Sequence, residues 1–143
     1  MSPHLRRGRR VARENALRLL FEGDVAGRDP VTLLEGRCEE LGLDPRTLAY
    51  TKTLVSRVSA NSDEIDVIIG RLAPAWPVVQ MARLDVAILR IAISEIDDGD
   101  VPPTVAVSEA VELAKRYCND GARRFINGAL GTYVRSQTDP TDV

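Results

Sequence analysis

The sequence predicts an all-α protein of about seven helices, arranged in two small helical subdomains that form one compact domain. Apolar residues recur at steps of three and four along most of the chain, which is the period of an amphipathic helix. Prolines, glycines and Asp-Pro pairs interrupt this pattern where helices are expected to begin and end. A chain of 143 residues with 44% hydrophobic content can bury one core. We expect a helical domain over 1–136, with subdomains over about 6–60 and 61–136, and a disordered polar tail over 137–143.

Three antiparallel helices are predicted in the first subdomain. The first has a packing stripe at helical spacing, made of Val11, Ala12, Asn15, Ala16, Leu19, Leu20 and Gly23. Asp29-Pro30 and Asp44-Pro45 each place an N-cap residue before a proline at the first helical position. Gly42 lies where a C-terminal cap would end the helix between these two pairs.

The second subdomain is predicted to open with a helix that begins at Asn61 or Ser62. Pro74 and Pro77, on either side of Trp76, are expected to end it, because proline interrupts a helix interior. One face of this helix is apolar and is made of Ile65, Ile68, Ile69 and Leu72.

The next helix, over 78–96, is predicted to be central. It is apolar on almost every side, which is typical of a helix that neighbours cover around most of its circumference. It also contains Arg90, and charged side chains are seldom buried without a partner. We therefore expect Arg90 to pair with a carboxylate of this helix or another one.

Two further helices complete the prediction. The segment 101–103 reads Val-Pro-Pro and must be extended, because a residue that precedes proline is unfavourable in a helix. A sixth helix follows it, and the turn at 119–121 separates this helix from a seventh. The seventh continues through Asn127-Gly128, because its helical period is not flanked by any alternating strand pattern.

Five arginines and no Asp or Glu occupy the first 13 residues: Arg6, Arg7, Arg9, Arg10 and Arg13. The whole chain has 19 Lys and Arg against 21 Asp and Glu, so residues 14–143 hold 14 basic and 21 acidic side chains. The positive charge is therefore local. A basic patch on an acidic body attracts polyanions to one place and leaves other surfaces for a different partner. The alternative is a solvated terminus whose charge only aids solubility.

The arginines are predicted to form a ridge on the first helix. At about 100° per residue, an arc of roughly 100° contains Arg6, Arg9, Arg10 and Arg13. The planar guanidinium group pairs with phosphate oxygens through two parallel hydrogen bonds, which lysine cannot do. This geometry favours a surface that binds a nucleic acid.

Single-stranded RNA fits this surface better than DNA does. A helix-turn-helix protein would need a basic recognition helix, and none of the middle helices is basic enough. Arginines can instead hold the phosphates of a single strand while an aromatic ring stacks on an unpaired base. Tyr117 and Phe125 are candidates for stacking, and both flank a turn that carries Arg123 and Arg124. Packing between the last two helices is the alternative role of both rings.

The residue types needed for catalysis do not form a recognisable constellation. His4 is the only histidine, no Cys and His cluster could hold zinc, and no glycine-rich loop follows a predicted strand. We therefore predict no enzyme activity, no metal and no cofactor.

Cys38 and Cys118 lie outside any CxxC pair and are expected to be reduced, partly buried thiols. We find neither a secretory signal nor an apolar stretch near the roughly 20 residues of a membrane span, so we expect a cytoplasmic protein.

Four segments stand out in a specific order and spacing: 9–17 (RRVARENAL), 84–96 (LDVAILRIAISEI), 105–115 (VAVSEAVELAK) and 125–128 (FING). Together they resemble the NusB transcription antitermination family, from about Arg6 to Arg135. Any one segment alone would be a weak signal. The resemblance implies the NusB-like fold of seven helices in two subdomains.

The resemblance also implies a function. Members of this family bind single-stranded boxA RNA of nascent ribosomal RNA leader transcripts in complex with NusE, a small-subunit ribosomal protein. With other Nus factors, this complex modifies RNA polymerase so that it passes terminators. The family contains both monomers and homodimers, and in a dimer the arginine helix would be covered.

Functional residues of the family can be carried over by position. The arginine-rich RNA-binding motif falls on Arg6, Arg7, Arg9, Arg10 and Arg13. The second RNA-contacting region falls on Asp120, Gly121, Arg123, Arg124 and Phe125, and an acidic NusE-contacting position matches Asp85. Two positions depart from the family pattern. Ser108 stands where Asn is frequent, and Gly121 stands where an acidic residue is usual, with Asp120 one position out of step.

Two other functions share parts of this pattern. A similar helical module recognises RNA at the start of ribosomal RNA cytosine methyltransferases, but those enzymes need a further domain that binds S-adenosylmethionine, and we expect none here. A protein adaptor whose RNA contact is made only through NusE is the stronger alternative. An RNA titration with and without NusE would distinguish these functions.

Overall fold

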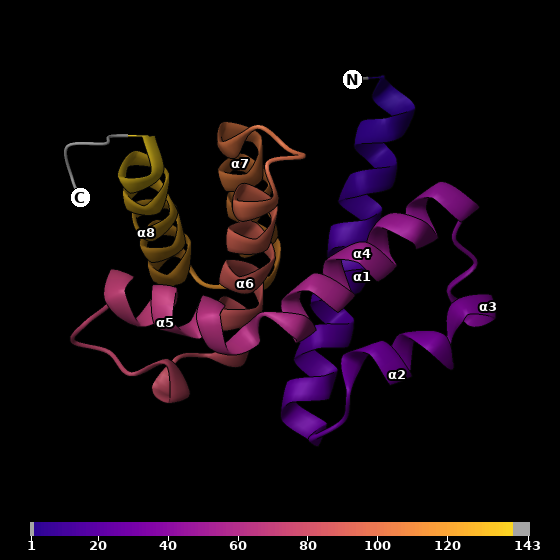
Figure 1. The fold of residues 1–143 in the computed structure, drawn as a ribbon, viewed down its shortest axis with the longest axis horizontal. Coiled ribbons are helices and arrows are strands. Elements are labelled where there is room, and N and C mark those ends of the chain that lie inside the picture. Colours follow the sequence, from indigo (N-terminus) through magenta and orange to yellow (C-terminus); the bar gives the residue numbers. More distant parts are fainter. Residues whose placement is uncertain (1, 139–143) are drawn as a thin grey trace. The chain divides into compact units, whose positions relative to one another are not determined.

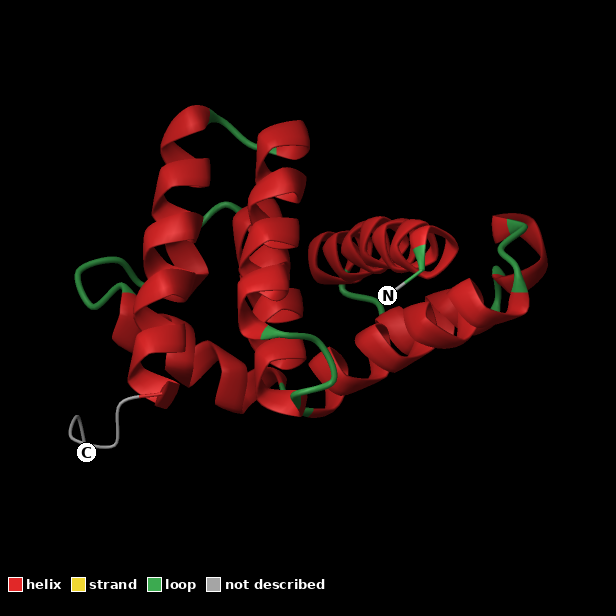
Figure 2. Ribbon diagram, turned by 90° about the horizontal axis from the view of Figure 1, so that it is seen from above, coloured by secondary structure: helices red, strands yellow, loops and turns green. Residues whose placement is uncertain are grey.

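The computed structural model describes residues 2–138 and confirms the all-α prediction. These residues form eight α-helices and one 3₁₀ turn, and none of them lies in a strand (Figure 2). The elements are α1 (Pro3–Ala26), α2 (Pro30–Glu35), α3 (Cys38–Leu41), α4 (Pro45–Ala60), α5 (Ser62–Leu72), η1 (Val78–Gln80), α6 (Arg83–Asp98), α7 (Pro103–Tyr117) and α8 (Asp120–Thr138). The chain divides into two compact units, unit 1 (Met1–Asn61) and unit 2 (Ser62–Val143).

In unit 1, α1 packs against α4 and α2 (Figure 1). It begins where the Ser2 hydroxyl accepts a hydrogen bond from the backbone N–H of Leu5, and a proline occupies its first position. It ends at Gly27, whose φ of 67° lies in the left-handed region that favours glycine. Most of the predicted stripe is buried, namely Ala12, Ala16, Leu19, Leu20 and Gly23.

Both Asp-Pro pairs begin helices as predicted. The carboxylate of Asp29 accepts a hydrogen bond from the N–H of Val31, and that of Asp44 accepts one from the N–H of Thr47. Gly42 closes α3 with a φ of 60°. The capping residues predicted in unit 1 therefore begin or end helices in the structure.

The helix predicted between these pairs is interrupted, so the expectation of a single helix there is wrong. α2 ends at Glu35 and α3 begins at Cys38. Gly36 between them has a low helix propensity. Arg37 leaves the helical path (φ −122°, ψ 7°) and donates two hydrogen bonds, of 2.7 and 2.5 Å, to the carboxylate of Glu22 on α1. The ion pair between Arg37 and Glu22 on α1 thus competes with the continuation of α2 into α3.

In unit 2, α6 is the central helix, as its composition predicts. It contacts α5, α7 and α8 (Figure 1), and every residue from Asp85 to Ile96 except Arg90 is buried. The helix begins later than the predicted residue 78, because Val78–Gln80 forms a 3₁₀ turn and Met81 is extended. The guanidinium of Arg83 donates to the carbonyls at both ends of this turn, those of Val78 and Met81.

Arg90 pairs with a carboxylate, as predicted, and the structure identifies it as that of Asp66 on α5. Nε and Nη2 of Arg90 donate to the two carboxylate oxygens of Asp66, each over 2.8 Å. Two parallel charged hydrogen bonds fix the relative orientation of the two side chains. The pair therefore ties α5 to the central helix.

Two helices, α7 and α8, complete unit 2. α7 begins at Pro103, after Pro102 in an extended conformation (φ −54°, ψ 136°), as the Pro-Pro pair predicts. α8 runs without interruption through Asn127-Gly128, so the helical period does outweigh the turn dipeptide. It continues to Thr138, which makes the first two residues of the predicted tail helical. The rest of that predicted tail lies outside the described residues.

Candidate nucleic-acid interface

The arginine-rich segment lies on the first turns of α1 in unit 1. Arg6, Arg7 and Arg10 are exposed, and the first turn of the helix contains no acidic residue. The start of a helix also carries the positive end of its dipole, which adds to the attraction for anions. These three guanidinium groups are therefore accessible to phosphate oxygens.

Two other arginines turn inward. Arg9 is half-buried, with its Cζ 4.7 Å from the centroid of the Tyr50 ring. Arg13 is only 3% exposed, and its Cζ lies 5.9 Å from the same ring. Arg13 lies three and four residues before Ala16 and Leu17, which are both buried, and residues at this spacing share one face of a helix. This face of α1 is therefore exposed near the start of the helix and covered from Arg13 onward. Arg13 thus departs from the predicted surface ridge.

Tyr50 on α4 is a neighbour of this segment that our sequence analysis missed. Its spacing of four residues from the buried Leu54 could have placed it on the packing face of its helix. A cavity of about 370 Å³ lies between the first turns of α1 and α4, and Arg9, Arg46, Thr47 and Tyr50 contribute to its lining. Tyr50 therefore lies where the arginine segment borders this cavity.

One carboxylate, that of Asp44, shares this cavity. Its Oδ1 accepts the backbone N–H of Thr47 at 3.0 Å, and its Oδ2 accepts the Thr47 hydroxyl at 2.9 Å. These two hydrogen bonds, the backbone one above all, hold the pKa of Asp44 below its usual value. The carboxylate is therefore ionised at neutral pH, beside the cationic side chains of Arg9 and Arg46.

The second predicted RNA-contacting region is the start of α8 in unit 2. Asn119 accepts a 2.7 Å hydrogen bond from a backbone N–H and caps the helix. Asp120 lies 3.8 Å from Arg123, so these two surface charges partly offset each other. Gly121 and Arg124 are exposed. Arg124 is thus the more available of the two arginines.

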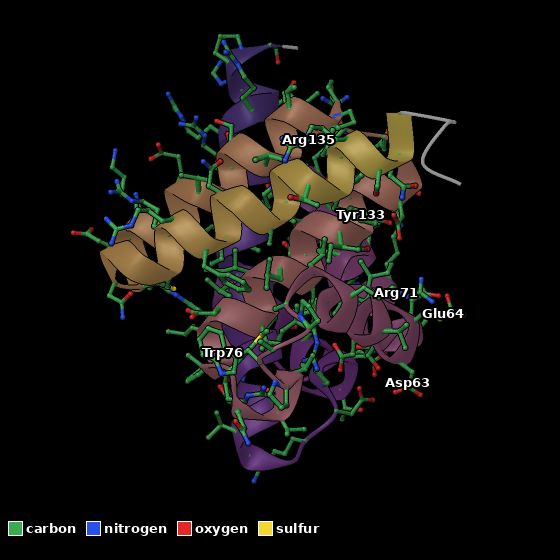
Figure 3. The ribbon with its side chains drawn as sticks, turned by 90° about the vertical axis from the view of Figure 1, so that its left-hand side faces the viewer. Asp63, Glu64, Arg71, Trp76, Tyr133 and Arg135 are labelled. Atoms are coloured by element: carbon green, nitrogen blue, oxygen red, sulfur yellow. The ribbon has the colours of Figure 1, made fainter. Side chains whose placement is uncertain are left out.

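Phe125 packs on Trp76, from the loop between α5 and η1. The ring centroids are 5.7 Å apart and the planes are inclined by 56°. Trp76 is 42% exposed, so this aromatic pair reaches the surface. Figure 3 shows Trp76 below the first half of α8, away from Tyr133 and Arg135 near the other end of that helix. The other stacking candidate, Tyr117, is half-buried at the end of α7.

Asp85, which the family resemblance assigns to partner binding, lies in the first turn of α6 and is 7% exposed. Its carboxylate accepts a hydrogen bond from the thiol of Cys118. Burial, together with this hydrogen bond, raises the pKa of Cys118 to about 12, which makes the thiol a poor nucleophile at neutral pH. Both Cys38 and Cys118 are unbridged and half-buried, as predicted.

Residues 2–138 hold neither a candidate membrane span nor a candidate metal site. No helix there has the length and apolar character that a membrane crossing requires. No group of three or more His, Cys, Asp or Glu side chains in the same residues could hold a metal ion.

Comparisons with known proteins show that this chain is similar to a characterised family. The model of the NusB family matches residues 10–135. The transcription antitermination protein NusB of Saccharopolyspora erythraea is 43% identical over 125 residues, which are 86% of this chain and 84% of that protein. NusB of Desulforamulus reducens is 36% identical over 95% of this chain and 96% of its own. A crystal structure of antitermination factors NusB and NusE with double-stranded RNA contains a chain that matches with a TM-score of 0.82 and 26% identity, over 91% of this chain and 98% of that one.

Proposed function

This chain belongs to the NusB family, and on that premise we propose that it is a transcription antitermination factor. It binds single-stranded boxA RNA of nascent ribosomal RNA leader transcripts together with NusE, a small-subunit ribosomal protein. With other Nus factors, the complex helps RNA polymerase to pass terminators. The proposed role is one of binding in the cytoplasm, without catalysis and without a cofactor.

The observation that supports RNA binding best is the exposed positive charge at the start of α1. Arg6, Arg7 and Arg10 are accessible there, with no acidic residue in the first turn. The rest of the chain, with 14 basic and 21 acidic side chains over residues 14–143, repels a polyanion. RNA is therefore drawn to the start of α1, where each guanidinium can hold one phosphate.

The start of α8 is proposed as a second RNA contact. Arg124 is exposed and can hold a phosphate, while the Asp120–Arg123 pair limits how far the Arg123 guanidinium moves. Gly121 leaves the turn without a side chain. Phe125, which packs on Trp76 and is partly exposed, is proposed to offer its ring to an unpaired base.

Partner binding is proposed on two grounds. The similar crystal structure contains antitermination factors NusB and NusE in complex with double-stranded RNA. Residues 14–143 hold 14 basic and 21 acidic side chains, and this acidic balance leaves surface outside the proposed RNA contacts that suits a protein partner. Asp85, which is 7% exposed, is proposed to contribute to the NusE contact.

The test is an RNA titration with and without NusE, at low and high salt. We expect the complex to bind boxA RNA much more tightly than the isolated chain, because three exposed arginines make few contacts alone. Equal affinity for boxA RNA and for a scrambled strand would contradict the proposal. The solution mass is measured in parallel, since a homodimer that covers α1 would hide this surface.

The adaptor alternative predicts a different result in the same titration. If the RNA contact is made only through NusE, replacement of Arg6 and Arg10 by Ala leaves the affinity of the complex unchanged. If α1 contacts RNA directly, the same replacement weakens binding, most strongly at low salt. The two functions are thereby separated by one double variant.

A further inference from the structure

We propose that the cavity between the first turns of α1 and α4 binds one unpaired nucleotide of the RNA, with its base stacked on Arg9 and Tyr50. This inference rests on the RNA-binding function proposed above and adds a site that the arginine motif does not define. The cavity joins an aromatic ring, guanidinium groups and hydroxyl oxygens. These are the groups that proteins use to hold unpaired bases of a single strand.

The cavity has the dimensions of a small-molecule site. Its volume of about 370 Å³ falls near the lower end of the roughly 300–1,000 Å³ that is typical of ligand pockets. One wall is formed by Leu5, Gly8 and Arg9 of α1, and the other includes Arg46 and Tyr50 of α4. A space of this size suits one nucleoside and is too small for a helix of a protein partner, which is about 10 Å across.

The close approach of the two helices at the cavity depends on Gly8. A Cβ atom at this position would lie 2.9 Å from Oγ1 of Thr47, which is closer than such atoms pack. A side chain at this position would force either the Thr47 side chain or α1 itself to shift. Glycine is unfavourable inside a helix compared with alanine, so the contact with Thr47 accounts for a glycine in the middle of the arginine segment.

Arg9 and Tyr50 form a preassembled stacking surface. The Arg9 guanidinium lies over the Tyr50 ring at 4.7 Å, and Arg13 approaches the same ring at 5.9 Å. Bases stack both on aromatic rings and on guanidinium planes. Because these side chains are already held together, a base that enters the cavity orders fewer groups on binding.

The polar lining supplies hydrogen-bond acceptors and a further cation. The Thr47 hydroxyl donates to Oδ2 of Asp44 at 2.9 Å, and the Thr53 hydroxyl donates to the Ala49 carbonyl at 3.0 Å. Each hydroxyl oxygen keeps lone pairs that can accept N–H groups of a base. The exposed Arg46 can hold the phosphate of the same nucleotide.

The exposed arginines lead a strand past this cavity. Arg9 follows Arg6 by one helical turn and directly precedes Arg10, and both of these neighbours are exposed. A backbone held by Arg6 and Arg10 therefore passes Arg9, and a base that turns inward there meets the Arg9 and Tyr50 pair.

The test uses single-stranded RNA in which 2-aminopurine replaces each base in turn, with the full chain and NusE present. At one position the fluorescence should fall on binding, because stacking quenches this base. Tyr50→Leu should remove the quenching and weaken RNA binding about tenfold. The salt slope should stay unchanged, because stacking releases no counterions. Tyr50→Phe keeps the ring and should behave as wild type.

A second variant keeps the test decisive if the Tyr50 variant is poorly folded. Ala49 is exposed and lines the cavity, so Ala49→Leu fills the cavity without altering the core. Ala60→Leu places the same side chain at the exposed end of α4, outside the cavity lining. Ala49→Leu should weaken RNA binding about tenfold, whereas Ala60→Leu should not change it.

The outcomes separate this site from the proposed function. Wild-type affinity and quenching in both Tyr50→Leu and Ala49→Leu would overturn the nucleotide site and leave RNA binding by α1 in place. Absence of RNA binding by the wild-type chain with NusE would contradict the proposed function and this site with it. Displacement of the RNA by an equal concentration of AMP would assign the cavity to free nucleotides and would also overturn the proposal.

Discussion

The arginines in the first half of α1 should divide into two groups that differ in what their removal changes. Replacing Arg6, Arg7 or Arg10 by Ala should remove one phosphate contact each, because these side chains are exposed. Each contact contributes about −0.7 to the slope of log K against log salt concentration for a single strand. These three contacts alone therefore contribute about −2.1 to the slope, which corresponds to about a 20-fold loss of affinity between about 50 and 200 mM salt. Each single replacement should flatten the slope by about 0.7.

Arg13 belongs to the other group because it is 3% exposed and lies over Tyr50. Arg13→Ala should leave the salt slope unchanged and lower the free energy of unfolding by about 2 kcal/mol, through lost packing and a lost cation–π contact. Arg18→Ala is the matched control. The Arg18 side chain is 66% exposed and pairs with Glu14 at 3.2 Å on the surface, so both quantities should change little.

Two assays check this division. Fluorescence anisotropy of labelled boxA RNA, with NusE present and over a series of salt concentrations, gives the slope. Urea unfolding followed by circular dichroism gives the free energy of unfolding. The reasoning would be refuted if Arg13→Ala flattened the slope as much as Arg10→Ala while unfolding like the wild type. That result would place the Arg13 guanidinium on a phosphate and not against Tyr50.

Three further changes test helix packing, partner contact and thiol chemistry. Gly23→Ala should lower the free energy of unfolding by about 2 kcal/mol, because its Cβ would lie 2.6 Å from the Arg28 carbonyl oxygen. Gly70→Ala, with no atom within 4 Å, should raise it by about 0.5 kcal/mol in the same urea titration, and equal effects would contradict this. Asp85→Asn should weaken NusE binding about fivefold in calorimetry, and a wild-type affinity would remove Asp85 from the interface. Burial raises the pKa of the Cys118 thiol from 9.0 to about 12. At pH 8 the native thiol should therefore react with iodoacetamide about a thousandfold more slowly than the thiol of the unfolded chain. Peptide mass mapping can measure both rates, and equal rates would exclude this burial.

Features that depend on one short segment are well predicted from the sequence. Asp29 and Asp44 each cap a helix, because a polar residue before a proline starts a helix without help from elsewhere in the chain. The helix predicted over 78–96 is central, because a helix that is apolar on almost every side has to be covered whatever its orientation. Local chemistry is sufficient in these cases.

Features that join two distant segments are not predicted. At the break between α2 and α3, Gly36 is a local signal, but Arg37 also reaches Glu22 on α1, and no pattern within residues 30–41 shows that contact. The sequence shows that Arg90 needs a carboxylate, but several lie within reach of the helix, and only folding selects Asp66. Side-chain partners of this kind depend on how helices are placed in space.

By itself, the amino-acid order determined that this chain is helical, where its main helices begin, and that its positive charge is concentrated at one end. Only the tertiary structure decided which of those charges meet solvent. Arg10 and Arg13 share one side of α1, yet Arg10 is exposed and Arg13 is buried. The helical period sets the direction of a side chain about its own axis. How deeply the side chain is buried depends on the neighbour that covers that side of the helix. For Arg13 this neighbour is the ring of Tyr50, which comes from a different helix.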